Sequence, residues 1–117
     1  MITAPANLKI MVASRPIDFR RGVNGLVALV ADALRSDPYS GAVYIFRSKR
    51  LDRLKLVVWD GTGMIMLSKW LGEGRFFWPP VADGAVTPSA SQMSLLLDGL
   101  DWSGATPKEV RRPGIMK

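Results

Sequence analysis

The sequence predicts an α+β domain, in which an antiparallel meander sheet of four to five strands carries two helices packed together on one face. Four short strand-like segments, separated by turns rich in Gly and Asp, lie at residues 42–47, 53–59, 64–70 and 75–78. A helical repeat of apolar residues precedes them over residues 18–34, and a second one follows Thr87. These observations predict one domain over residues 1–103.

Composition narrows the possible functions. The 117 residues are 48% hydrophobic and carry a formal net charge of +6. The chain contains no Cys and no His, which removes disulfides, thiolate metal sites and the commonest general base. Its apolar runs are far shorter than the ~20 residues that span a bilayer, and its first residues lack the pattern of a signal peptide. We therefore expect a cytoplasmic protein without a membrane anchor.

Each element has its own start and stop signals. Residues 8–13 form a short apolar strand, whose place in the sheet the sequence leaves open. Asp18 is the expected N-cap of the first helix. In the second helix Thr87 is the expected cap, Pro88 suits the first turn and Gly99 ends the helix. The apolar stripe of the first helix consists of Val23, Leu26, Val27, Val30 and Leu34. That of the second helix consists of Ala90, Met93, Leu96 and Leu97.

The second and third strands of the meander form a hairpin around Asp60-Gly61, because Asp-Gly between alternating apolar residues is a strong hairpin signal. If these two residues occupy the turn, Arg53 lies opposite Ser68, and a turn one residue later places Arg53 opposite Trp70. Both registers sort the side chains onto the same two faces. We expect a core face of Leu54, Leu56, Val58, Ile65 and Leu67, and a second face of Arg53, Lys55, Val57, Met64, Met66, Ser68 and Trp70.

Positive charge is concentrated at the start of this hairpin. Five cations fall within nine residues, and Asp52 is the single acidic residue among them. A strand holds such side chains in fixed directions, for which a phosphate backbone is the obvious partner. The alternative is a solvated sheet face, which is the usual role of charged residues on strands. The predicted nucleic-acid-binding residues are Arg47, Lys49, Arg50, Arg53 and Lys55, with Arg20, Arg21 and Arg75 as additions.

A second kind of surface is predicted from Trp70, Met64 and Met66. Aromatic and Met side chains that a sheet leaves uncovered are typical of protein–protein contacts. These three residues therefore predict an alternative function, in which the protein is an adaptor that docks onto a protein partner.

A metal-dependent nuclease is a third, remote hypothesis, because such an enzyme needs two or three acidic side chains to converge. Nearly all the acidic residues stand at predicted caps or turns, where Asp is expected for local reasons. We expect no catalytic residues, no metal, no cofactor and hence no enzymatic activity. The acidic residues considered are Asp18, Asp52, Asp60, Glu73, Asp83, Asp98 and Asp101.

Several segments, in order along residues 8–102, resemble those of one protein family. They are Pro16-Ile17-Asp18-Phe19-Arg20-Arg21-Gly22, Gly25-Leu26, Asp37-Pro38-Tyr39-Ser40-Gly41, Phe46-Arg47, Asp52-Arg53-Leu54-Lys55, Trp59-Asp60-Gly61, Gly63, Gly74-Arg75-Phe76, Trp78-Pro79 and Leu97-Asp98-Gly99-Leu100-Asp101-Trp102. The chain resembles the TnpB-type accessory protein, the second open reading frame of the bacterial insertion-sequence family numbered sixty-six. This family is distinct from the RNA-guided nucleases that share the TnpB name.

The resemblance implies a role in DNA transposition. The implied partners are the separately encoded transposase and the other accessory protein of the same element, and no catalytic residues are implied. Together with the basic hairpin, it leads us to expect a non-enzymatic accessory protein that binds element DNA. The alternative that stays open is the adaptor, docked onto the transposase.

The last residues carry half of the net charge. Residues 1–107 hold twelve Lys or Arg against nine Asp or Glu, and residues 108–117 hold four against one, so each part contributes +3. The segment contains Pro and Gly and has no apolar periodicity, which is typical of a flexible chain. We expect residues 104–117 to be a flexible basic tail, either an inert end or an arm in which Arg111 and Arg112 contact DNA.

Deleting residues 104–117 should leave the thermal stability of the domain nearly unchanged, because the tail has nothing to bury. If the tail contacts phosphates, the deletion also lowers DNA affinity and makes its salt dependence shallower, by up to four phosphate contacts. Thermal unfolding and DNA titrations at several salt concentrations measure the two effects. An unchanged salt dependence would restrict DNA contact to the hairpin, and a large loss of stability would contradict the domain boundary.

Overall fold

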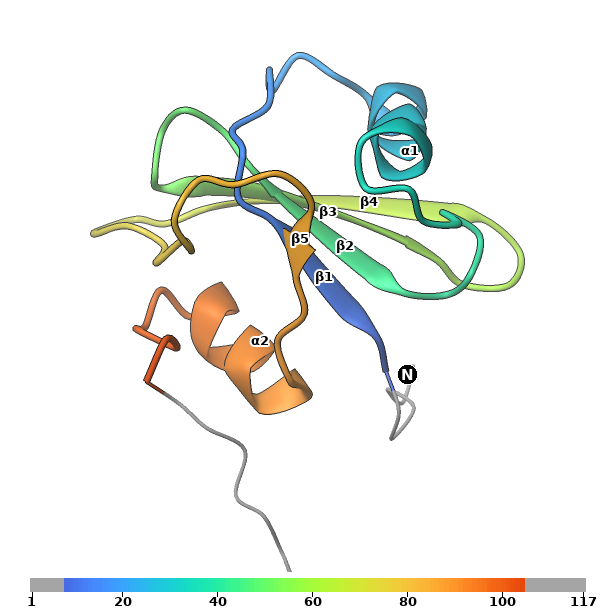
Figure 1. The fold of residues 1–117 in the computed structure, drawn as a ribbon. Coiled ribbons are helices and arrows are strands. Elements are labelled where there is room, and N and C mark those ends of the chain that lie inside the picture. Colours follow the sequence, from blue (N-terminus) through green and yellow to red (C-terminus); the bar gives the residue numbers. More distant parts are fainter. Residues whose placement is uncertain (1–7, 105–117) are drawn as a thin grey trace, which may run out of the picture.

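The computed structural model describes residues 8–104, and its elements follow one another in the order β1, α1, β2, β3, β4, β5, α2 (Figure 1). The described strands form one sheet in the order β4-β3-β2-β1-β5. No helix within residues 8–104 combines the length and apolar character needed to cross a membrane. The strands are β1 (Ile10–Ala13), β2 (Val43–Arg47), β3 (Arg53–Trp59), β4 (Met64–Trp70) and β5 (Ala85–Val86), and the helices are α1 (Val23–Asp32) and α2 (Ala90–Leu97).

The sheet is mixed, which corrects the predicted antiparallel meander. Strands β2, β3 and β4 form an antiparallel meander as expected, but β1 lies parallel to β2. A parallel pair needs a long crossover connection, and α1 lies in the connection between these two strands. As a result β1 occupies an interior position, between β2 and β5.

The strand predicted at residues 75–78 is absent from the described structure. This segment leaves the end of β4 and passes the β2–β3 connection, where the Phe76 N–H donates to the Leu51 carbonyl over 2.9 Å. Pro79 and Pro80 follow directly, and a proline lacks the N–H that a further ladder bond would require. The fifth strand is instead β5, which pairs antiparallel with the end of β1.

The prediction that both helices pack on one face is wrong, because α1 covers one face of the sheet and α2 covers the other (Figure 1). Side chains alternate along β2, so that it contributes apolar residues to both faces, and each face needs its own cover. The core on the α2 side consists of Ile10, Val12, Val43, Ile45, Leu54, Leu56, Phe76, Leu96 and Trp102. The core on the α1 side consists of Ala13, Leu26, Val30, Ala42, Tyr44, Phe46 and Val57.

Helix α1 begins at Val23, five residues after the predicted N-cap. Gly22 takes the N-cap position and offers no side-chain hydrogen bond. The Asp18 carboxylate instead accepts the backbone N–H of Arg20 over 2.9 Å, within a turn that precedes the helix. Residues 16–22 are therefore a loop, and this loop crosses one end of the sheet.

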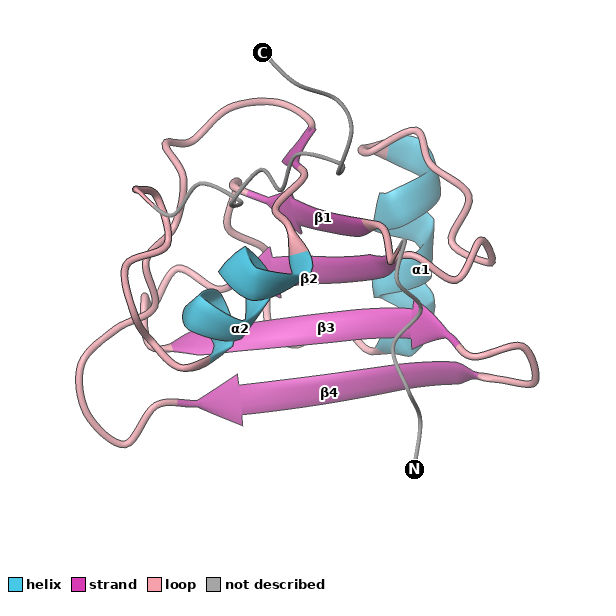
Figure 2. Ribbon diagram, turned by 90° about the horizontal axis from the view of Figure 1, so that it is seen from below, coloured by secondary structure: helices cyan, strands magenta, loops and turns pink. Residues whose placement is uncertain are grey.

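Helix α2 begins after Ser89 rather than after the predicted cap, Thr87. The Ser89 hydroxyl accepts the Gln92 N–H over 3.1 Å, and the Gln92 side chain accepts the Ser89 N–H over 2.9 Å. This reciprocal pair is a capping box, which satisfies two amides that a helix start otherwise leaves free. Gly99 ends the helix as predicted, with a φ of 75° that favours glycine. Figure 2 shows that α2 covers one end of its sheet face and leaves the other end open.

The β3–β4 hairpin adopts the second of the two predicted registers, with Arg53 opposite Trp70. Gly61 lies in the turn with a φ of 100°, a conformation that residues with a side chain rarely adopt. The Asp60 carboxylate accepts the Thr62 N–H over 2.8 Å, and the backbone hydrogen bond from Thr62 holds the pKa of Asp60 below its usual range. The register brings Arg53 and Trp70 together at the end of the sheet that the loop before α1 crosses.

Candidate nucleic-acid interface

A groove at this end of the sheet collects basic side chains from two segments distant in sequence. The loop before α1 forms one wall, and the β2–β3 connection with the first residue of β3 forms the other. The groove has a volume of about 410 Å³, and four of its nine lining residues are Lys or Arg, against one Asp. This feature is termed the basic groove, and its lining residues are Pro16, Ile17, Asp18, Phe19, Arg20, Ser48, Lys49, Arg50 and Arg53.

Hydrogen bonds hold the two walls of the basic groove in place. The Ile17 N–H donates to the Arg47 carbonyl over 2.9 Å, which docks the loop before α1 onto the end of β2. Ser48 is buried, and its hydroxyl donates to the Arg50 carbonyl over 2.7 Å, which tightens the β2–β3 connection. Lys49 and Arg50 are exposed on this connection, with their side chains available to a ligand.

Lys55, predicted as a phosphate contact, is buried and 9% exposed. Its ammonium group donates to the Phe19 carbonyl over 2.7 Å and to the Arg21 carbonyl over 2.9 Å. The same nitrogen lies 4.9 Å from the centroid of the Phe19 ring. Because this ammonium group is committed to two carbonyls, we leave Lys55 out of the proposed interface. Its bonds hold the loop that carries Arg20 against β3.

Arg53 and Trp70 form a stacked pair across β3 and β4. The guanidinium carbon lies 3.6 Å from the centroid of the Trp70 ring, which is a cation–π contact. Asp52 lies beside this pair, with its Oδ1 atom 3.9 Å from Arg53 Nε and 3.5 Å from Arg50 Nε. Trp70 is 65% exposed, whereas Trp102 is buried and the other two tryptophans are half-buried.

Two further predicted cations lie near the same end of the sheet. Arg75 is exposed and directly precedes Phe76. The Phe76 N–H donates a hydrogen bond to the Leu51 carbonyl in the β2–β3 connection. The Arg47 Nε donates to the Ser48 carbonyl over 3.2 Å, and strand alternation places its side chain on the α2 face, whereas Arg53 lies on the α1 face. The predicted cations that lie outside the described residues are Arg111 and Arg112.

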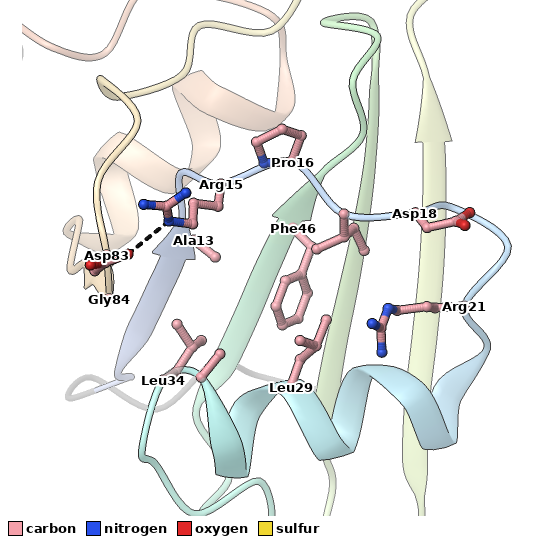
Figure 3. Close-up of a pocket in the computed structure, with 12 residues that line it drawn as sticks. Ala13, Arg15, Pro16, Asp18, Arg21, Leu29, Leu34, Phe46, Asp83 and Gly84 are labelled. Atoms are coloured by element: carbon pink, nitrogen blue, oxygen red, sulfur yellow. Dashed lines mark hydrogen bonds and ion pairs between the residues drawn. The ribbon is translucent and has the colours of Figure 1, made fainter.

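A second cavity, of about 440 Å³, lies between α1 and the sheet (Figure 3). Phe46 points from the sheet toward the helix, and Leu29 rises from the helix to meet it. Arg21 lines this cavity and does not line the basic groove, although its neighbour Arg20 does. The basic and acidic side chains of the cavity are equal in number, so we assign no phosphate to it. They are Arg15, Arg21, Asp18 and Asp83.

The predicted partner-binding side chains lie along β4, an edge strand of the described sheet. Met66 and Trp70 are exposed, whereas Met64 is partly buried against the core on the α1 side. Leu67 lies opposite Leu56 and thus on the predicted face, but it is 56% exposed, so the burial expected of it is wrong. The core on the α2 side contains no residue of β4. The alternation of apolar and polar residues could not reveal that Leu67 is exposed, because its exposure depends on where α2 lies on the sheet.

Several of the acidic residues accept local hydrogen bonds. Asp18, Asp60 and Asp101 each accept hydrogen bonds from the residue two positions later, and these bonds lower the pKa of each carboxylate below its usual range. This bonding agrees with the turn and cap roles expected of acidic residues. Within residues 8–104, no three or more acidic side chains lie close enough to hold a metal ion.

The fold is that of a small, basic α+β protein in which cations gather at one end of the sheet. The chain belongs to the family described as IS66 Orf2 like protein, whose model matches residues 8–107. This match confirms the resemblance inferred from the motifs. The protein is thus an insertion-sequence accessory protein, and the family associates it with transposition and the transposase system.

Two relatives from Sinorhizobium fredii (strain NBRC 101917 / NGR234) span nearly the whole chain. The uncharacterized protein y4jC is 55% identical over 113 residues, which cover 97% of each chain. The uncharacterized protein y4hO is 34% identical over 113 residues, which cover 97% of this chain and 96% of the relative. No solved structure matches the chain.

Replacing Lys55 by Met should destabilise the domain, because it leaves the Phe19 and Arg21 carbonyls without their buried donor, at about 1–3 kcal/mol for an unsatisfied group. Lys69→Met is the matched control. The Lys69 ammonium group also donates to a carbonyl, that of Leu97 over 2.6 Å, but Lys69 is exposed and water can replace it. Urea unfolding measures both variants. An equal loss of stability in the two would contradict the structural role of Lys55.

Proposed function

We propose that this accessory protein binds the DNA of its element through the basic groove and the adjoining end of the sheet, without catalysing a reaction itself. The observation that carries the proposal is the convergence of four cations from two separate segments on one groove. A phosphate backbone is the ligand that such a strip of cations attracts. The proposed phosphate contacts are Arg20, Lys49, Arg50, Arg53 and Arg75, with Arg111 and Arg112, which lie outside the described residues.

The ion pairs of the basic groove leave it with excess positive charge. Arg20 pairs with Asp18, while Arg50 and Arg53 share Asp52. Lys49 forms no ion pair within residues 8–104. Four cations against two carboxylates leave a local net charge of +2. The Asp18 side chain is 48% exposed, so that phosphate can compete for Arg20, whereas the Asp52 side chain is 29% exposed. Phosphate contacts position a protein without reading bases, so we expect this surface to give affinity rather than sequence choice.

Replacing Lys49 by Gln should weaken binding to terminal-repeat DNA, because this exposed cation has no ion-pair partner within residues 8–104 and can contact phosphate. The plot of log affinity against log salt should become shallower by about 0.9, the value for one phosphate contact. Lys9→Gln is the control, since Lys9 is exposed and precedes β1 at the opposite end of the sheet. Fluorescence anisotropy across a salt series measures both variants. A flat salt dependence of the unmodified protein, or no binding at low salt, would rule out the proposed function.

Replacing Asp18 by Asn should tighten DNA binding, because Asp18 neutralises Arg20 inside the basic groove across 2.6 Å. Asp83→Asn is the control, since it makes the same charge change at an ion pair with Arg15, outside the groove. The hydrogen bond from the Arg20 side chain holds the pKa of Asp18 far below its usual range. The carboxylate is therefore ionised throughout about pH 5–8, and the gain in affinity should be constant there. Equal gains in both variants would show that overall charge, rather than the groove, governs binding.

The exposed edge of β4 supports a second candidate function, that of an adaptor for the transposase or the other accessory protein of the element. An edge strand carries unpaired backbone groups that a strand of another protein can bind. Met66, Leu67 and Trp70 are 37%, 56% and 65% exposed along this edge. These side chains would supply apolar contacts to the partner, next to the backbone hydrogen bonds that its strand forms with β4.

Leu67→Lys should abolish co-purification with the transposase if the edge of β4 is the docking surface. Val81→Lys is the matched control, because Val81 is 57% exposed and lies outside the sheet. The pull-down is made without DNA and at high salt, which suppresses association through nucleic acid. Retention that appears only when DNA is added back would instead show that DNA bridges the two proteins.

A further inference from the structure

We propose that the stacked pair of Arg53 and Trp70 is a binding site for an unpaired DNA base, so that this surface prefers single-stranded DNA to duplex. The inference rests on the proposed DNA-binding function and goes beyond it, because it specifies the form of DNA. It also gives a function to an aromatic ring that neither hydrophobic core includes.

The Trp70 ring is stacked against one flat group, the Arg53 guanidinium, and can accept a second one. The Arg53 guanidinium covers one ring face at 3.6 Å from the centroid, yet 65% of the residue is still exposed. A residue this exposed leaves room for a second flat group beside the part of the ring that Arg53 does not cover. An aromatic ring that stacks on a base, with an Arg contributing cation–π attraction, is a recurring arrangement for single strands.

Arg53 joins the ring to the proposed phosphate track. Its side chain lines the basic groove while its guanidinium lies over Trp70. Its Nε forms no hydrogen bond in the described part of the chain, and the nearest carboxylate oxygen, that of Asp52, lies 3.9 Å away. A strand whose phosphates follow the groove would thus place its next base beside the exposed ring.

Duplex DNA cannot use this site without opening, because each base of a duplex is already stacked between its neighbours and faces its partner strand. An unpaired base has a free face and needs no such disruption. The Arg53 guanidinium lies on the ring, and Arg50 and Arg53 together face the single carboxylate of Asp52. This local excess of positive charge favours an anionic chain over an apolar protein segment as the occupant. Stacking of this kind tolerates every base, so we expect little sequence preference.

The test compares the unmodified protein, Trp70→Leu and Trp59→Leu as full chains. Trp59 is the matched control, because it is half-buried at the far end of β3, where it contacts the Tyr39 ring at 5.3 Å. Fluorescence anisotropy measures the affinity of each for a labelled oligothymidine of about fifteen nucleotides and for a duplex of the same length. Trp70→Leu should lower the affinity for oligothymidine roughly 5- to 150-fold, equivalent to ~1–3 kcal/mol, and leave duplex binding unchanged. Trp59→Leu should change neither.

A conservative variant and thermal unfolding separate stacking from damage to the fold. Trp70→Phe keeps an aromatic face and should retain most of the affinity for oligothymidine, with a thermal midpoint equal to that of Trp70→Leu. Equal losses on oligothymidine and duplex would overturn the inference, as would an unchanged affinity in Trp70→Leu. Loss of transposase co-purification with DNA binding intact would assign the ring to the adaptor surface. Salt-dependent duplex binding without a preference for single strands defeats this inference alone, whereas no binding to either DNA defeats the proposed function itself.

Discussion

The hydrogen bonds of the Lys55 ammonium group are the interaction on which the candidate site depends. Because α1 begins at Val23, the carbonyls of Phe19 and Arg21 precede the helix and have no helical partner. Lys55, near the start of β3, donates to both carbonyls, at 2.7 Å and 2.9 Å. The loop is thereby fixed across the end of β3, and Arg20, which lies between the two bonded residues, is turned outward into the basic groove. The buried cation Lys55, which is itself unavailable to a ligand, thus positions the exposed cation Arg20.

The sheet leaves few places where charge can gather. Helix α1 covers one face and α2 part of the other, so the strands are buried in their central part, where an unpaired charge is costly. Cations therefore collect where the chain leaves the core, on the β2–β3 connection and on the loop that crosses it. The edge strand β4 is the other uncovered region of the described sheet, and it carries apolar rather than charged side chains over most of its length. DNA binding and adaptor docking are accordingly proposed for two adjoining surfaces, which meet at Arg53 and Trp70.

Several features of the fold and of the site could be predicted because their causes are local. The Gly61 turn and the alternation of β3 and β4 predicted the hairpin and reduced its register to two choices, one of which the structure adopts. The start of α2 was predicted at Thr87, whereas the local pattern of Ser89 followed three residues later by Gln92 is that of the observed capping box. Alternation placed Leu67 and Lys55 on the correct faces, but it did not indicate that Leu67 is exposed and Lys55 is buried. The packing of distant elements decides whether a face is covered.

The sequence by itself determined the family, the hairpin, the concentration of cations near its start and the approximate extent of both helices, since these follow from residue identity and short-range spacing. Only the tertiary structure decided that the helices lie on opposite faces, that β1 runs parallel to β2, and that Arg20 shares a groove with Lys49. It also decided that Lys55 is buried, through bonds to residues 36 and 34 positions away. Such contacts depend on the order in which strands pair and on the face that each helix covers. Both depend on how much apolar surface each arrangement buries over the whole domain, which a local sequence pattern does not show.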